Sequence, residues 1–142
     1  MYLSSFVFCP SSTGLNIVKK IRVLIADDNA AVRQGLRAFL SLREEIEVVG
    51  EAANGLEAVE HTSRLLPDVV LMDLMMPQLD GIEATRRINS LGFSTQVIVL
   101  SNFSEEEKVF SATKAGAVSY LLKSVSPDDL VKAIQAAHCG ET

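Results

Sequence analysis

The stretch from Val69 to Gly81 reads Val-Val-Leu-Met-Asp-Leu-Met-Met-Pro-Gln-Leu-Asp-Gly, and it decides how the rest of the chain is interpreted. Its first four residues are all apolar, which is typical of a strand buried on both faces of a parallel sheet. The run ends at a single carboxylate, Asp73, where turn residues begin. Because ligands collect at the carboxyl ends of strands in such sheets, Asp73 is a candidate functional residue, with a turn or helix-capping acid as the alternative.

Length, charge and hydropathy limit the classes of protein to consider. The 142 residues fit one domain with a substantial core. With 18 acidic against 13 basic residues and a net charge of -5, the chain lacks the positive field that attracts duplex DNA or an anionic membrane. No stretch approaches the roughly 18 apolar residues of a membrane span, and no secretory signal pattern is present. We expect a cytoplasmic protein without membrane contact.

Residues 1–19 do not share the pattern of the rest of the chain. Serine, threonine and glycine surround a short apolar patch from Phe6 to Cys9, and periodic patterning begins only near Ile21. We therefore expect residues 1–19 to be a flexible, dispensable leader and residues 20–142 to form one domain.

From Ile21 the sequence alternates five short apolar runs with amphipathic segments. The runs are rich in β-branched residues and have strand-like lengths. The alternation predicts an α/β protein, with a doubly wound parallel sheet, helices on both of its faces and right-handed crossovers. The predicted strands are residues 21–26, 46–50, 69–72, 96–100 and 118–122.

The segments between these runs carry signals for the starts and ends of helices. A capping side chain stands three residues before an acid in three places, and Gly92 and Gly116 stand where a helix is expected to end. Apolar stripes on the first and third segments predict core-facing helix surfaces. The capping pairs are Asn54 with Glu57, Ser104 with Glu107, and Ser126 with Asp129, and the stripes are Val32, Leu36, Phe39 and Leu40, and Ile82, Ile88 and Leu91.

Polar residues follow four of the five predicted strands, namely Asp27-Asp28, Asp73, Ser101 and Lys123. Because the carboxyl ends of parallel strands meet at one edge, we expect these side chains to converge. Three carboxylates repel one another unless a cation lies among them, and Mg²⁺ prefers oxygen ligands and often shares a substrate phosphate. A hydroxyl and an ammonium suit the oxygens of a phosphoryl group. Each residue alone could be a cap, a turn residue or a solvated side chain, but the joint set favours phosphoryl chemistry.

The same residues carry a resemblance to a known family. Ile-Ala-Asp27-Asp28, Asp73-Leu-Met-Met-Pro77, Ser101 after Val-Ile-Val-Leu, and the segment ending in Tyr120-Leu-Leu-Lys123 resemble the receiver domain of bacterial two-component response regulators. The resemblance covers about residues 20 to 140. It implies a flavodoxin-like or CheY-like sheet with strand order 2-1-3-4-5. The segment from Ala115 to Lys123 and the end of the chain are similar to the LuxR/NarL subfamily, whose receivers precede a helix-turn-helix domain.

For the acidic edge, the resemblance implies that Asp73 takes a phosphoryl group from a phosphohistidine on a sensor histidine kinase, or from a small phosphodonor. Asp28, Asp73 and the backbone carbonyl of Met75 would bind Mg²⁺ directly, Asp27 would act through water, and Lys123 would pair with the phosphoryl oxygens. The chain would be a signalling phosphoacceptor that assists its own phosphorylation and dephosphorylation, and not an enzyme with a separate substrate.

The resemblance also implies a switch. Phosphorylation adds about -1.5 to -2 of charge, which would draw the Ser101 hydroxyl inward and let Tyr120 occupy the space that it leaves. This would change the surface of the fourth helix, fifth strand and fifth helix, where a homodimer could form. Transcription would be controlled through a DNA-binding domain, which these 142 residues do not contain, and we expect negligible DNA binding by this chain alone.

The sequence departs from the family pattern after two of these residues. Ser124 follows Lys123 where many receivers have proline, so the last loop of the edge is expected to differ in shape. Asn102 and Phe103 follow Ser101 where a small residue is frequent, and they are expected to narrow access to Asp73.

Three other functions are compatible with parts of the pattern. A flavin-binding module shares the alternation, but it needs a phosphate-binding loop where Asp27 and Asp28 stand. A Mg²⁺-dependent phosphohydrolase that works through an aspartyl phosphate usually carries its nucleophile on the first strand and has a cap domain. A receiver-like interaction module that never takes phosphate would usually lack the acids or the lysine.

Overall fold

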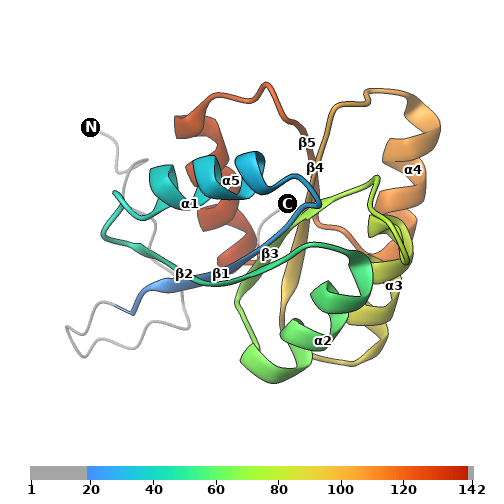
Figure 1. Ribbon diagram of the computed structural model, residues 1–142, viewed down its shortest axis with the longest axis horizontal. Coiled ribbons are helices and arrows are strands. Elements are labelled where there is room, and N and C mark those ends of the chain that lie inside the picture. The colour runs from blue at the N-terminus through green and yellow to red at the C-terminus, as the bar shows by residue number, and fades with distance from the viewer. Residues whose placement is uncertain (1–18, 141–142) are drawn as a thin grey trace.

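The apolar runs form the strands of a single parallel sheet. The computed structural model describes residues 19–140, in which five strands alternate with five helices (Figure 1). The elements are β1 Ile21–Ala26, α1 Ala30–Leu40, β2 Ile46–Ala52, α2 Gly55–Leu65, β3 Val69–Asp73, α3 Gly81–Ser90, β4 Gln96–Ser101, α4 Glu106–Ala115, β5 Ser119–Leu122 and α5 Pro127–His138.

The strand order is β2-β1-β3-β4-β5, which confirms the predicted sheet and its order. One hydrophobic cluster joins the sheet to α2, α3 and α4, and a second joins the opposite face to α1 and α5 (Figure 1). All five residues of β3 are buried. The uninterrupted apolar run from Val69 therefore marks the centre of the sheet, and Asp73 lies at its carboxyl edge.

The structure confirms two of the three predicted capping pairs. Asn54 and Ser126 accept hydrogen bonds from the amides of Glu57 and Asp129, as their capping positions predict. The capping role of Ser104 is wrong, because α4 begins at Glu106 after Glu105, without a side-chain cap.

The ends of α3 and α4 agree with their glycines. Gly92 and Gly116 have positive φ values of 77° and 115°, which glycine adopts without steric cost. Leu91, which we expected on the core stripe with Ile88, is instead 44% exposed, because it follows the last helical residue and no longer keeps to the buried face.

The pairing of β1 with β2 contains an irregularity. Val23 lies opposite Val48, but Leu24 lies opposite Gly50, so Val49 is an additional residue in β2. After this bulge, Glu51 lies opposite Ile25. Residues that lie opposite each other in a parallel pair share one face of the sheet, and Ile25 packs in the cluster beneath α1 and α5. Glu51 is thereby directed towards α1.

Residues 1–18, which make up nearly all of the predicted leader, lie outside the described residues, so the division into residues 1–19 and 20–142 stays a prediction. Within residues 19–140, no helix has the length and apolar character needed to cross a membrane.

Candidate functional site

The structure brings the predicted site residues to one edge of the sheet. Asp27 follows the last residue of β1, Asp73 and Ser101 are the last residues of β3 and β4, and Lys123 follows β5. The strands are in register there, with Asp73 opposite Leu100 and Ser101 opposite Leu122. These residues therefore lie at one edge of the sheet, as the strand pattern predicts.

Lys123 joins the first and third strands through its ammonium group. Its Nζ lies 2.8 Å from Oδ2 of Asp27 and 3.1 Å from Oδ1 of Asp73. Both aspartates are buried, with 3% and 7% exposure. Hydrogen-bonded ion pairs in such a shielded position are held in defined geometry. The lysine thus lies directly at Asp73, the carboxylate that the family resemblance implies as the acceptor.

Three carboxylates form a group that could hold a metal ion. Oxygen atoms of Asp27, Asp28 and Asp73 lie within 4.8 Å of one another. Asp28 is exposed while the other two are buried, so the group opens to solvent on one side. An all-oxygen donor set with an open side fits Mg²⁺, which usually keeps several water ligands. Met75 lies two residues after Asp73 in the loop between β3 and α3.

The protonation behaviour of the group reflects its crowding. Burial raises the pKa of the Asp73 carboxyl above its ordinary 3.8, the charge of Asp27 raises it further, and the hydrogen bond from Lys123 opposes the rise. For Lys123, burial acts to lower the pKa, but the hydrogen bonds and charges of Asp27 and Asp73 outweigh it and raise the pKa above 10.5. The lysine therefore stays charged, and a cation near Asp73 would relieve the repulsion between the carboxylates.

The acidic pair stands in a turn that leads into α1. Oδ1 of Asp27 accepts a hydrogen bond from the amide of Asn29 at 2.9 Å. Asn29, rather than either aspartate, is the N-cap of α1, since its side chain accepts from the amides of Ala31 and Val32. The alternative interpretation of Asp27 or Asp28 as a helix cap is therefore wrong.

Ser101 and Tyr120 are linked through one residue. The amide of Phe103 donates to the Ser101 hydroxyl at 3.0 Å, and the Tyr120 hydroxyl donates to the Phe103 carbonyl at 2.7 Å. Ser101 is fully buried, and Tyr120 is half-buried against the core cluster of α2, α3 and α4. The Ser101 hydroxyl is therefore bonded to the amide of Phe103 in the loop that follows β4, and Tyr120 is bonded to the carbonyl of the same residue.

Gly81 allows α3 to start directly against β3, the strand that ends in Asp73. A β-carbon at Gly81 would lie 2.0 Å from the carbonyl oxygen of Asp73, which no ordinary packing permits. The Gly81 amide also donates to the Leu74 carbonyl at 2.8 Å. Glycine at this position therefore fixes the path of the chain through Asp73.

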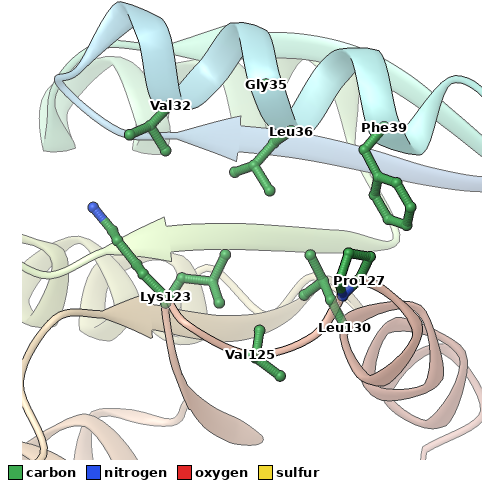
Figure 2. A pocket seen from close by; sticks show the side chains of 9 residues that line it. Val32, Gly35, Leu36, Phe39, Lys123, Val125, Pro127 and Leu130 are labelled. Carbon is green, nitrogen blue, oxygen red and sulfur yellow. The ribbon is translucent and has the colours of Figure 1, made fainter.

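An apolar cavity lies beside the acidic edge, between α1 and the start of α5. Figure 2 shows Val32, Leu36 and Phe39 of α1 facing Val125, Pro127 and Leu130, with Lys123 at one end of the cavity. The predicted apolar stripe of α1 thus lines this cavity on one side. The aliphatic part of Lys123 contributes to the wall while its ammonium reaches the carboxylates.

Sequence reasoning assigned no role to three residues that support the site, namely Arg33, Glu51 and Gly81. Arg33 donates to the backbone carbonyl of Asp27 and to the carboxylate of Glu51, and Gly81 contacts Asp73 closely. The four-residue spacing of Arg33 and Arg37 places both on one face of α1, which was the available signal. Their carboxylate partner could not be foreseen, because the bulge in β2 decides which way Glu51 points.

Known proteins share both the sequence and the fold. The family model for the response regulator receiver domain matches residues 23–135. The transcriptional regulatory protein LiaR of Bacillus subtilis is 48% identical over 121 residues, which are 85% of this chain and 57% of LiaR. The chain thus spans little more than half the length of such curated relatives.

Solved structures give the same result. The signal receiver domain of NarL from Mycobacterium tuberculosis is 36% identical, with a TM-score of 0.84 over 87% of this chain and 99% of that one. A two-component response regulator of the LuxR family from Aurantimonas sp. SI85-9A1 is 35% identical, with a TM-score of 0.82 over 87% and 88% of the two chains. With a matching family model, a CheY-like sheet and relatives of the LuxR/NarL type, the chain belongs to the response regulator receiver domains of two-component signalling.

Proposed function

We propose that Asp73 is the phosphoacceptor of this receiver. A carboxylate oxygen of Asp73 attacks the phosphorus of a phosphohistidine on a sensor histidine kinase; the P–N bond breaks, an O–P bond forms, and the imidazole leaves. The product is an acyl phosphate. The observation that carries the proposal is the Lys123 ammonium, which lies 3.1 Å from Asp73 and 2.8 Å from Asp27 at the carboxyl edge of the sheet.

The acidic group is the proposed site of Mg²⁺. Asp28, Asp73 and the Met75 carbonyl would hold the ion directly, and when bound it would neutralise charge on the transferring phosphoryl group. Asp27 would act through water, because its two carboxylate oxygens already accept hydrogen bonds from Asn29 and Lys123. The three carboxylates within 4.8 Å of one another support this assignment.

Lys123 and Ser101 are proposed to bind the phosphoryl oxygens. Catalysis by the receiver would consist of positioning and of charge stabilisation, as in other phosphoryl transfers. The chain would in this way assist both its own phosphorylation and the later hydrolysis of the acyl phosphate, without acting on a separate substrate.

The switch is proposed to run through Ser101 and Tyr120. Attraction of the Ser101 hydroxyl to the phosphoryl group would break its bond with the Phe103 amide, and the loop that Tyr120 holds would lose one of its two attachments. Tyr120 could then move inward. Such a change shifts a population only as far as phosphate binds the two states with different affinity.

The output of the switch is proposed to be transcription, exerted through a DNA-binding domain outside these residues. The LuxR-family relatives support this, since the chain spans 57% of the transcriptional regulatory protein LiaR. A phosphorylation-dependent homodimer through α4, β5 and α5 is supported by the exposure of Phe110, at 65%, and Leu122, at 40%, on that surface. The proposed location is the cytoplasm, where two-component receivers work.

The proposal is tested by intact mass after incubation with acetyl phosphate and Mg²⁺. We expect the gain of one phosphoryl group in the natural chain, no gain in Asp73→Asn, and no gain in the presence of EDTA. Asp80→Asn is the matched control, because Asp80 is an exposed aspartate that caps α3, and it should be phosphorylated normally. Phosphorylation that persists in Asp73→Asn would contradict the assignment.

A histidine kinase panel separates the remaining outcomes. A folded chain that gains no phosphoryl group from acetyl phosphate but gains one from a kinase is a donor-specific receiver. A folded chain that accepts phosphate from neither source signals by binding alone, and the proposed function is then wrong.

A further inference from the structure

We propose that Arg33 is a positioning residue, which holds the turn of Asp27 and Asp28 in the geometry that the metal ion requires. The inference rests on the proposed function of the acidic group as a Mg²⁺ site. Arg33 lies on α1 and belongs to neither the carboxylates nor the phosphoryl-binding residues. It acts through the backbone that carries them.

Two different acceptors share the Arg33 guanidinium. Its Nη1 donates to the backbone carbonyl of Asp27 at 2.7 Å, and its Nε donates to Oε1 of Glu51 at 2.9 Å. The side chain is only 18% exposed. Guanidinium is planar, with its donors in fixed directions, so holding one acceptor in β2 sets the position of the other. The end of β1 is thereby tied to β2 by a side chain as well as by the sheet.

Glu51 is a firm anchor for this link. Its second oxygen accepts from Nε of Arg37 at 2.6 Å, one helical turn after Arg33. The hydrogen bond from Arg37 lowers the pKa of Glu51, burial opposes this, and Arg33 lowers it further, so the carboxylate stays ionised in the folded chain. A backbone hydrogen bond joins the same two segments, since the Asp27 amide donates to the Ala52 carbonyl at 3.0 Å.

With Arg33 in place, Asp27 is bonded at each of its oxygens. The carbonyl accepts from Arg33, Oδ1 accepts from the Asn29 amide, and Oδ2 accepts from Lys123. The Asp27 carbonyl belongs to the peptide group that leads to Asp28, so holding it fixes the amide nitrogen and Cα from which the Asp28 side chain branches. Mg²⁺ demands near-octahedral geometry and tolerates little displacement of its ligands. Fixing this peptide should therefore strengthen metal binding at Asp28.

Charge and positioning predict opposite effects when Arg33 is removed. Arg33 carries a positive charge near the site, and by charge alone its loss should make the site bind a divalent cation more tightly. If instead Arg33 positions the ligands, its loss should weaken binding, since supporting contacts around a metal site are typically worth about 10–100-fold in affinity. The sign of the change therefore distinguishes the two roles.

The experiment measures Mg²⁺ affinity directly, by backbone amide chemical-shift titration of the natural chain, Arg33→Met and Arg37→Met. Methionine is unbranched and apolar, and it replaces the aliphatic part of the arginine side chain without its donors. Arg37→Met is the matched control, because it removes the same charge and the other contact with Glu51 but leaves the Asp27 carbonyl bonded. We expect Arg33→Met to bind Mg²⁺ about 10-fold more weakly, and Arg37→Met to lose much less affinity, because Glu51 and the Asp27 carbonyl keep their bonds with Arg33.

The possible outcomes are distinct. Unchanged or tighter binding by Arg33→Met, or equal weakening in both variants, overturns the positioning role while leaving the proposed Mg²⁺ site intact. If Arg33→Met does not fold, Arg33→Lys decides, because it keeps the charge but lacks the fork of donors: weaker binding supports the role and unchanged binding overturns it. If the natural chain itself does not respond to Mg²⁺, the inference and the proposed metal site are both wrong.

Discussion

The ammonium of Lys123 lies 2.8 Å from Asp27, closer than its 3.1 Å contact with Asp73. The cation is thus shared between a proposed metal-supporting acid and the proposed acceptor, and it offsets part of the repulsion between them. When a phosphoryl group arrives at Asp73, the ammonium is already within reach of the acceptor, so little reorganisation is needed to meet the new charge.

Replacement of Lys123 by methionine should therefore slow phosphorylation without removing the wall of the cavity that its aliphatic part forms. We expect the rate with acetyl phosphate and Mg²⁺ to fall by about 10²-fold, the usual scale for loss of one donor to a developing charge. Intact mass over time measures the rate. Lys132→Met, which changes an exposed lysine on α5, should retain the natural rate.

The raised pKa of Asp73 predicts how stability depends on pH and metal. Because burial and the Asp27 charge favour the protonated form in the folded chain, this carboxyl favours folding below about pH 3.8, and that contribution is lost as pH rises through the folded pKa. In EDTA at pH 7, Asp73→Asn should therefore be more stable than the natural chain, and the difference should shrink as the pH falls.

Addition of Mg²⁺ should reverse this order. An ion bound at the proposed site would stabilise the folded natural chain by mass action, whereas the asparagine variant would lack a charged ligand. Thermal unfolding of both proteins, with and without Mg²⁺, provides the measurement. A natural chain that is the more stable of the two in EDTA at pH 7 would show that the Lys123 ion pair outweighs burial and repulsion.

The link between Tyr120 and Phe103 predicts a cost for removing one hydroxyl. Tyr120→Phe keeps the ring but leaves the Phe103 carbonyl without this donor, so we expect a loss of about 1 kcal/mol in the free energy of unfolding. Urea denaturation measures the loss, and faster amide hydrogen exchange around Phe103 should accompany it. Phe110→Leu, at an exposed position on α4, should stay within about 0.5 kcal/mol of the natural chain.

The two glycines of the α1 and α3 helices should respond in opposite ways to a methyl group. Gly81→Ala would bring a β-carbon to 2.0 Å from the Asp73 carbonyl oxygen, and we expect it to destabilise the fold by about 1–3 kcal/mol and to slow phosphorylation. At Gly35, no neighbouring atom lies within 4 Å of the position that a β-carbon would take. Gly35→Ala should therefore stabilise α1 by about 0.5–1 kcal/mol. Similar changes in the two variants would contradict the close contact at Gly81.

The sheet and its edge could be predicted from the sequence because their signals are local. Each strand is an apolar run of strand-like length, and the parallel arrangement places the residue after each run at one edge. The first strand was predicted with its observed bounds, and the third and fourth differ by one residue at the end. The meeting of Asp27, Asp73, Ser101 and Lys123 followed from that arrangement alone.

The missed details depend on contacts between distant segments. Ser104 has the local sequence of a helix cap, but α4 begins two residues later, beyond the loop that Tyr120 holds at Phe103. The residue types in this loop do not indicate that the Phe103 carbonyl bonds to Tyr120, 17 residues later in the chain. In the same way, the value of Gly81 lies in its distance to a carbonyl on another element, which residue type and spacing do not reveal.

The unpaired residue Val49 decides whether Glu51 can support the acidic turn. With this one residue unpaired, Glu51 lies opposite Ile25 and faces the arginines of α1. If Val49 paired with Leu24 instead, Glu51 would lie opposite Ala26, whose side chain packs on the other side of the sheet, beneath α2 and α3. A related chain with a second strand of the same length but no bulge must therefore anchor the turn with a carboxylate from a different position, whereas a chain that lacks the bulged residue altogether can keep the arginine link.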